Sequence, residues 1–204
     1  AAESLGAEYK NKKSGTFGKI GIYSFNGNKI ITTSGGGALV SDDEELLAKA
    51  FFLATQAKDA APYYQHSLVG YNYRMSNVLA GIGRAQLEVL DERVDKRRAI
   101  FQKYYEELNS IEEIHFMPEI EQSKSNRWLT TLVIDPFMTK VTPFEFMDKM
   151  NQAKIETRLL WKPLQMQPLF KHTKFYKHNE RTTAVSEMLF KMGICIPSGS
   201  NMTE

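Results

Sequence analysis

The longest regular pattern in the sequence runs from Ser76 to about Asn109. Apolar residues recur there at steps of three, four and seven positions, which is the spacing of one face of an α-helix. They are Leu87, Leu90, Val94, Phe101 and Leu108. The mean globular helix has only about 11–12 residues. Strand-like runs lie on both sides, so we expect a long helix, straight or bent, that links two domains, rather than a coiled coil.

Strand-like runs also enclose a turn in the segment before this helix. The turn runs from Ser24 to Lys29, and three glycines follow at 35–37. The expected strands are 20–25, which should be buried, 30–33 and 38–40. Ser41 to Glu45 opens a helix with acidic residues in its first turn. The remaining segments before the long helix are a loop or short hairpin at 7–18 and a long loop at 56–75.

Strands and shorter helices alternate after position 109, which predicts a small α/β domain. The expected strands are 114–116, 128–135, 155–160 and 194–196. Helices are expected from Thr142-Pro143, with proline at the first helical position, and over 181–192. In the first of these, the residues expected to face inward are Phe144, Met147 and Met150. The segments expected to be irregular are 119–126 and 161–179.

Composition narrows the class of protein. A formal net charge of +2 gives no strong field that would favour nucleic acid or an anionic membrane surface. No apolar run approaches the ~20 residues that span a bilayer, so membrane insertion is not expected. The single cysteine, Cys195, excludes an intramolecular disulfide and is typical of a reducing compartment, which indicates the cytoplasm.

The two ends of the sequence suggest a piece of a longer protein. Ala1 to Gly6 contains no initiator methionine and resembles the end of an element whose start is missing. Ser198 to Glu204 resembles a loop that delivers a helix N-cap, Thr203, with no helix after it. We therefore expect the function to belong to a longer parent chain.

The sequence does not favour a glycine-rich nucleotide-binding loop, a hydrolase triad or a metal site. The glycines at 35–37 lack the ending of a P-loop and the spacing of a dinucleotide fingerprint, so close backbone packing is the simpler interpretation. Ser24 has no evident histidine partner for a hydrolase triad. No metal site is predicted, because no two of the histidines have the spacing of metal ligands. The histidines are His66, His115, His172 and His178.

Ser24 and Lys29 together suit a different chemistry. Pyridoxal 5′-phosphate enzymes need a hydroxyl that binds the phosphate and an amine that forms an imine. The lysine anchors the cofactor as a Schiff base and then serves as general acid and base. Most lysines only solvate a surface, so the spacing by itself does not select Lys29.

The motifs around this pair resemble those of one enzyme family. Ser24 to Lys29, followed by Thr33 to Gly37, resembles the lysine motif of the DegT/DnrJ/EryC1/StrS sugar aminotransferases. The other segments that resemble family signatures are 70–77, 80–88, 158–163 and 195–199. These matches follow the family order along essentially the whole chain. The implied fold is α/β, the C-terminal part of a fold-type I transferase that depends on pyridoxal phosphate.

The resemblance divides the chain into three parts. Residues 1–75 would be the end of the large cofactor domain, residues 76–109 a long linking helix, and residues 110–204 a small C-terminal α/β domain, truncated at its end. The resemblance also implies a homodimer, because one of its site residues acts only in the neighbouring subunit.

The resemblance also assigns roles to five residues. Lys29 would carry the cofactor and move a proton between substrate and cofactor carbons. Ser24 would bind the cofactor phosphate, and Glu3 would contact the ring hydroxyl. Asn72 would reach across the dimer interface to the phosphate of the partner's cofactor, and Arg74 would assist there. The family aspartate that pairs with the ring nitrogen would lie immediately before Ala1.

The implied reaction moves an amino group from an amino acid, usually glutamate, to a keto group on a nucleotide-linked sugar. Such reactions belong to amino-sugar or surface-polysaccharide biosynthesis. Family members that have histidine in place of the lysine are dehydratases, so Lys29 favours transamination. Two alternatives stay open: a non-catalytic binding or regulatory protein with the same fold, and a nucleotide-binding module that uses Gly35 to Gly37. The sequence does not identify the sugar, the carbon or the nucleotide.

Overall fold

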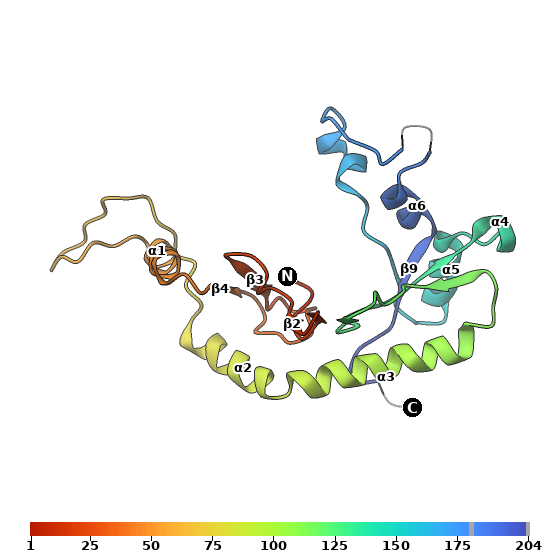
Figure 1. Ribbon diagram of the computed structural model, residues 1–204, viewed down its shortest axis with the longest axis horizontal. Helices are drawn as coiled ribbons and strands as arrows, with labels where there is room; N and C mark the ends of the chain where they lie inside the picture. The colour runs from red at the N-terminus through yellow and green to blue at the C-terminus, as the bar shows by residue number, and fades with distance from the viewer. Residues whose placement is uncertain (180–181, 203–204) are drawn as a thin grey trace. The chain divides into compact units, whose positions relative to one another are not determined.

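The computed structural model describes residues 1–179 and 182–202, whose elements can be followed in Figure 1. The chain divides into two compact units. The first comprises Ala1–Lys96 with Glu119–Trp128, and the second comprises Arg97–Pro118 with Leu129–Glu204. The predicted division into residues 1–75, 76–109 and 110–204 describes the domains of the longer parent protein, and it stays a prediction.

Two small antiparallel sheets organise the first unit. In one, β1 (Glu8–Tyr9) pairs with β2 (Lys12–Lys13), which confirms the short hairpin, and also with β6 (Ser123–Lys124). The prediction that residues 119–126 are irregular was therefore wrong at β6. Main-chain pairing with β1 orders this short strand, a long-range effect that the polar local sequence does not reveal.

The second sheet is the hairpin of β3 (Gly21–Ser24) and β4 (Gly37–Val40), and both strands were predicted. The expectation that the first strand is buried was wrong, because the side chain of Ile22 is exposed. The strand expected at 30–33 does not form, since these residues lie in the loop that closes the hairpin. Their apolar, β-branched sequence predicted a strand. The structure buries three of them, Ile30, Ile31 and Thr33, without pairing them in a sheet.

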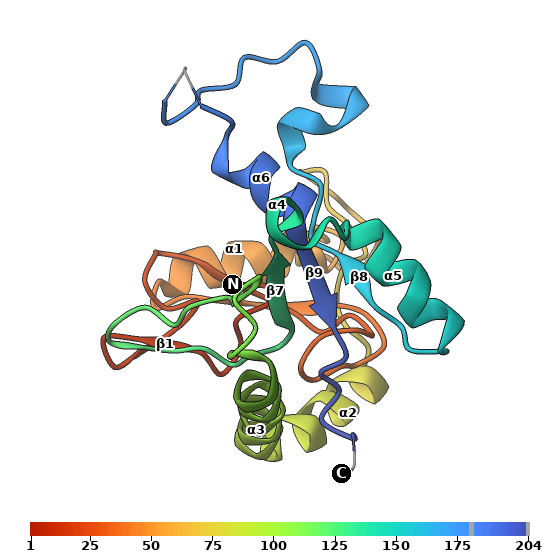
Figure 2. The same ribbon diagram turned by 90° about the vertical axis from the view of Figure 1, so that its right-hand side faces the viewer.

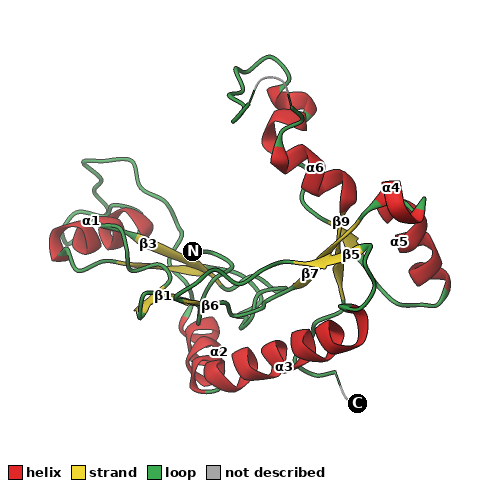
Figure 3. Cartoon of the chain, turned by 45° about the vertical axis from the view of Figure 1, so that its right-hand side comes forward, coloured by secondary structure: helices red, strands yellow, loops and turns green. Residues whose placement is uncertain are grey.

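The helices of the first unit begin at side-chain caps. α1 (Glu44–Ala54) starts at Asp43, whose carboxylate accepts a hydrogen bond from the Leu46 N–H. α2 (Asn77–Glu88) starts at the predicted cap, Ser76. The long loop predicted at 56–75 connects the two helices (Figure 3). None of the helices in the described residues has both the length and the apolar character that a membrane crossing requires.

The long helix predicted from Ser76 to Asn109 is two helices. α2 ends at Glu88 with Val89 as its C-cap, and α3 (Leu90–Leu108) begins at the next residue and continues into the second unit. The Val89 N–H bonds to the Gln86 carbonyl, three residues back, at 3.3 Å instead of continuing the four-residue ladder. Valine is a weaker helix former than its neighbours, because its branched Cβ restricts χ1. The apolar period continues across the break, so periodicity alone could not detect it.

The second unit contains a four-stranded antiparallel sheet in the order β5-β7-β9-β8, of which Figure 2 labels β7, β9 and β8. The strands are β5 (Ile114–Phe116), β7 (Thr130–Ile134), β8 (Arg158–Leu159) and β9 (Gly193–Ile196). Each lies within or next to a predicted strand. Leu132 and Ile134 of β7 pack with Ile194 and Ile196 of β9 to form the buried core. The alternating burial along β7 is typical of a strand with one face against a core.

Helices and short turns complete the second unit. They are α4 (Pro136–Thr139), α5 (Pro143–Gln152), α6 (Val185–Met192) and the 3-10 turns η1 (Leu164–Met166) and η2 (Pro168–Phe170). α5 starts at Thr142-Pro143, as predicted, and Thr142 and Glu145 also form a capping box there. Phe144 is exposed, contrary to expectation, while Phe146 and Met147 pack against the core. The helix predicted over 181–192 begins only at Val185, and residues 182–184 are not helical. Arg181 and the predicted cap, Thr203, lie outside the described residues.

Cys195 provides a test of this core. It lies buried in β9, and burial raises the pKa of its thiol to about 11. We expect its alkylation by iodoacetamide at pH 8 to be at least about 100-fold slower in the native protein than in urea, since only the thiolate reacts. Mass spectrometry of the Cys195 peptide measures both rates. Comparable rates in the two states would contradict the buried position.

Candidate active site

The loop that closes the β3–β4 hairpin presents Lys29. The loop comprises residues 25–36, because Ser24 pairs with Gly37 at the end of the sheet. The Phe25 carbonyl accepts hydrogen bonds from the Thr33 N–H at 3.0 Å and the Thr32 hydroxyl at 3.1 Å. The Lys29 N–H donates to the Asn26 carbonyl at 3.0 Å, which closes the turn. These bonds, together with the buried side chains at 30, 31 and 33, hold the backbone on both sides of the lysine.

The Lys29 amine has two partners. Its Nζ lies 2.9 Å from Glu3 Oε1 and 4.4 Å from the centroid of the Trp128 ring. The lysine side chain is only 12% exposed, whereas Glu3 is exposed. An ammonium that is largely removed from water needs compensation, and a carboxylate and an aromatic face supply it. The structure therefore brings together two of the predicted site residues, Glu3 and Lys29.

Trp128 is a site residue that sequence reasoning missed. Its indole N–H donates to the carbonyl of Asn28 at 2.7 Å, across 100 residues of sequence. The sequence placed Trp128 at the start of a strand, and only β-propensity marked it. No local pattern connects it to the lysine turn, because the contact depends on the tertiary fold.

Ser24 lies at the entrance of the same loop. Its Oγ accepts a long hydrogen bond, 3.4 Å, from the Asn26 N–H. The hydroxyl is half-buried at the end of β3. Ser24 and Lys29 thus occupy the two ends of one turn, as the sequence predicted.

The glycines at 36 and 37 serve the packing of this hairpin. Gly36 has φ +87°, a conformation that side-chain-bearing residues rarely adopt. A Cβ at Gly37 would lie 2.3 Å from the Tyr23 carbonyl oxygen of the paired strand. Close backbone approach, the interpretation favoured from the sequence, therefore holds at Gly37, whereas a Cβ at Gly35 would meet no atom within 4 Å.

Asn72 and Arg74 lie in the long loop between α1 and α2. Asn72 forms an isolated β-bridge with Thr55, and its side chain is exposed. The Arg74 guanidinium lies 4.7 Å from the centroid of the Phe51 ring. Neither residue contacts Lys29 within the described part of the chain, so the structure does not bring these two predicted residues to the lysine.

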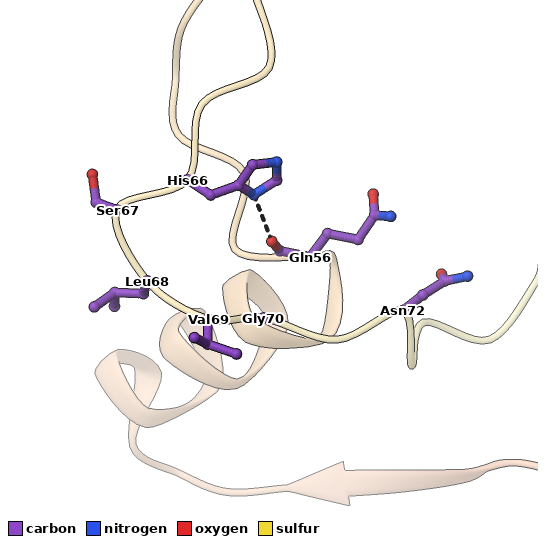
Figure 4. A pocket seen from close by; sticks show the side chains of 7 residues that line it. All are labelled: Gln56, His66, Ser67, Leu68, Val69, Gly70 and Asn72. Carbon is purple, nitrogen blue, oxygen red and sulfur yellow. Dashed lines mark hydrogen bonds between the residues drawn. The ribbon is translucent and has the colours of Figure 1, made fainter.

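Asn72 lines a hollow of about 580 Å³ in this loop (Figure 4). His66 Nδ1 lies 2.9 Å from the Gln56 carbonyl oxygen across it. A Cβ at Gly70 would come within 2.3–2.4 Å of the backbone of Gln56 and Ala57, so only glycine lets the two sides of the loop approach. The lining residues are Gln56, His66, Ser67, Leu68, Val69, Gly70 and Asn72. No group of three or more histidine, cysteine or carboxylate side chains suitable for a metal ion occurs in residues 1–179 and 182–202.

Solved structures share this fold. The aminotransferase TlmJ from Streptoalloteichus hindustanus superimposes with a TM-score of 0.86 at 21% identity, over 99% of this chain and 53% of its own. Helicobacter pylori PseC, an aminotransferase involved in the biosynthesis of pseudoaminic acid, gives a TM-score of 0.85 at 22% identity, over 100% and 54% of the two chains. The fold is therefore that of about half of each of these aminotransferases, as expected for part of a fold-type I transferase.

The chain belongs to the DegT/DnrJ/EryC1/StrS aminotransferase family, whose model matches residues 1–204. EpsN of Bacillus subtilis (strain 168) is 59% identical over 204 residues, which are 100% of this chain and 52% of that protein. GDP-perosamine synthase of Escherichia coli O157:H7 is 34% identical over 97% of this chain and 51% of its own length. The chain thus spans about half the length of these curated relatives. The family's cofactor is pyridoxal phosphate, and structures of Streptococcus pneumoniae Spr1654 with this fold include a PLP form and a PMP form.

Proposed function

We propose that the full-length protein is an aminotransferase that acts on a nucleotide-linked keto sugar, with an amino acid, glutamate, as donor. The observation that carries this proposal is the Lys29 amine, held 2.9 Å from Glu3 in a loop whose backbone is fixed on both sides. The relatives include GDP-perosamine synthase of Escherichia coli O157:H7 and a UDP-4-amino-4,6-dideoxy-N-acetyl-beta-L-altrosamine transaminase of Campylobacter jejuni. The pathway we propose is amino-sugar or surface-polysaccharide biosynthesis in the cytoplasm.

The residues present fit pyridoxal phosphate. The fit rests on a lysine amine that is held beside a carboxylate, on the exposure of that carboxylate, and on the Ser24 hydroxyl at the other end of the turn. Lys29 would hold the cofactor covalently, Ser24 would bind its phosphate, and Glu3 would contact the ring hydroxyl. When bound, the cofactor supplies an electron sink that stabilises a carbanion next to the amino group.

The chain's own residues supply the proton chemistry and the positioning. Lys29 would remove the proton from the substrate carbon that bears the amino group and would deliver it to the cofactor carbon, first as a base and then as an acid. The low exposure of its side chain limits competition by water at the amine. Ser24 would donate a hydrogen bond to a phosphate oxygen from its place at the end of β3.

We also propose that the full-length protein is a homodimer in which Asn72, assisted by Arg74, serves the cofactor phosphate of the partner subunit. The exposed position of Asn72 supports this assignment, because its amide is open to an incoming group. This chain spans about half the length of its relatives, so we expect it to have little or no turnover when produced alone.

Reductive trapping tests the role of Lys29. The full-length protein is incubated with pyridoxal phosphate, reduced with borohydride and digested, and the modified peptide is mapped by mass spectrometry. We expect one label per subunit on Lys29 and little on Lys58, a lysine that lies over the Tyr64 ring. Label spread over many lysines, or absent from Lys29, would favour a binding or regulatory protein without catalysis.

Substrate assays test the reaction itself. The full-length protein is given glutamate and a panel of keto-sugar nucleotides, and we expect turnover with at least one of them. Turnover by the 204-residue chain alone at the rate of the full-length protein would contradict the expectation that this half is insufficient.

A further inference from the structure

Trp128 reaches the lysine site from a segment that returns to the first unit after α3. The segment is Glu119–Trp128, and β6 within it pairs with β1. Trp128 itself is only 7% exposed. Its ring face meets the Lys29 amine and its indole N–H meets the carbonyl of Asn28. One side chain thus contacts both the lysine's ammonium and the backbone of the preceding residue.

Asn126 fixes the position of Trp128 relative to Glu3. Its buried side-chain amide donates to the carbonyls of Glu3, at 2.9 Å, and Leu5, at 3.0 Å. Its side-chain oxygen accepts from the Trp128 N–H at 3.1 Å. Through this one amide, the backbone that carries Glu3 and the backbone that carries Trp128 are held together. The two partners of the lysine amine therefore form one connected structure.

The buried setting separates this pair from other contacts between lysines and aromatic rings. Lys58 lies 4.5 Å from the centroid of the Tyr64 ring, but Tyr64 is 83% exposed. Attraction between a cation and a ring is weak at exposed sites and stronger where water is removed. The distances in the two pairs are similar, so burial is the difference that matters.

We propose that Trp128 is a positioning residue for Lys29. Its ring holds the amine beside Glu3 whenever the lysine is not bonded to the cofactor, and its indole N–H fixes the turn from which the lysine extends. Trp128 acts through Lys29 and does not itself take part in the chemistry. This inference rests on the proposed role of Lys29, because a lysine that alternates between a bonded and a free state needs a defined position in the free state.

The test measures the reactivity of Lys29 in the cofactor-free full-length protein. Lysines are acetylated briefly at pH 8, and the rate at each lysine is read by mass spectrometry. In the wild-type protein we expect Lys29 to react at least about tenfold more slowly than Lys58, because its amine is held and shielded. Equal rates at Lys29 and Lys58 would overturn the proposal without any variant.

Two variants separate the ring from the indole N–H. Trp128→Met removes the ring while filling much of its volume, and we expect it to accelerate acetylation of Lys29 about tenfold. Trp128→Phe keeps a ring and loses the N–H, so we expect an increase of no more than about threefold. The control Tyr64→Leu should leave Lys29 unchanged and alter Lys58 by no more than about threefold. Circular dichroism confirms that each variant is folded.

The outcomes distinguish this inference from the proposed function. If folded Trp128→Met and Trp128→Phe both leave the Lys29 rate within about twofold of wild type, the positioning role is refuted, whether or not trapping on Lys29 succeeds. If trapping on Lys29 fails while the Trp128 variants still accelerate its acetylation, the proposed function is refuted, but the positioning of the Lys29 amine by Trp128 is supported. If Trp128→Met does not fold, Trp128→Phe and the wild-type acetylation rates of Lys29 and Lys58 remain as tests. Equal rates at the two lysines would then refute the positioning role.

Discussion

Lys29→Ala is expected to lower the transamination rate of the full-length protein by about 10³-fold or more. A positioned acid or base contributes about 10²–10⁴-fold to a rate, and this substitution also removes the covalent anchor of the cofactor. The loop should keep its shape, because its backbone bonds and buried residues do not involve the lysine side chain. Steady-state rates and a thermal melt of the variant test both parts of this expectation.

Two further variants control this experiment. Lys29→Arg keeps a cation that can pair with Glu3 but loses the nucleophilic amine, so we expect it to be as inactive as Lys29→Ala. Lys58→Ala removes an exposed lysine and should retain activity within about twofold. An active Lys29→Arg variant would show that charge, not amine chemistry, is what the site requires.

Ile194→Ala is expected to destabilise the second unit by about 3–4 kcal/mol. Ile194 is 0% exposed, lies in β9 between β7 and β8, and packs in the core with Leu132, Ile134 and Ile196. Truncation of such a residue removes buried apolar surface and leaves a cavity, which together cost about 2–5 kcal/mol. Urea unfolding measured by circular dichroism reports the change in the free energy of unfolding.

Ile120→Ala is the matched control, because it makes the same chemical change at a residue that is 73% exposed. We expect its effect to stay within about 0.5 kcal/mol. Equal effects of the two substitutions would contradict the core assigned to the second unit.

The sequence predicted most elements because their signals are local. Thr142-Pro143 gave the start of α5, Ser76 gave the start of α2, and the β-branched runs gave β7 and β9. Each of these signals depends on capping geometry or on side-chain alternation, and both are visible within a few residues.

The errors fall where tertiary contacts decide. Ile30 and Ile31 are buried in a loop, and burial of an apolar run looks the same in sequence whether or not the run pairs as a strand. β6 consists of two polar residues and exists because its backbone pairs with β1. The break at Val89 leaves the apolar period intact, so no pattern of side chains marks it.

The candidate site could be predicted in part for the same reasons. Ser24 and Lys29 are five residues apart and belong to one turn, and the resemblance added Glu3, which the structure places against the lysine. Trp128 and Asn126 could not be predicted as site residues, because no local sequence pattern indicates that they contact residues 3–29.

The distance in sequence between Asn28 and Trp128 also bears on synthesis of the chain. The two residues that close the lysine site are 100 residues apart. Ribosomes add about 5–20 residues per second, so Lys29 is incorporated about 5–20 s before its aromatic partner. During that interval β4, α1, α2, α3, β5 and β6 are synthesised. A nascent chain that stops before residue 128 therefore carries the reactive lysine without the residues that hold it, and the site is completed only when synthesis has passed that point.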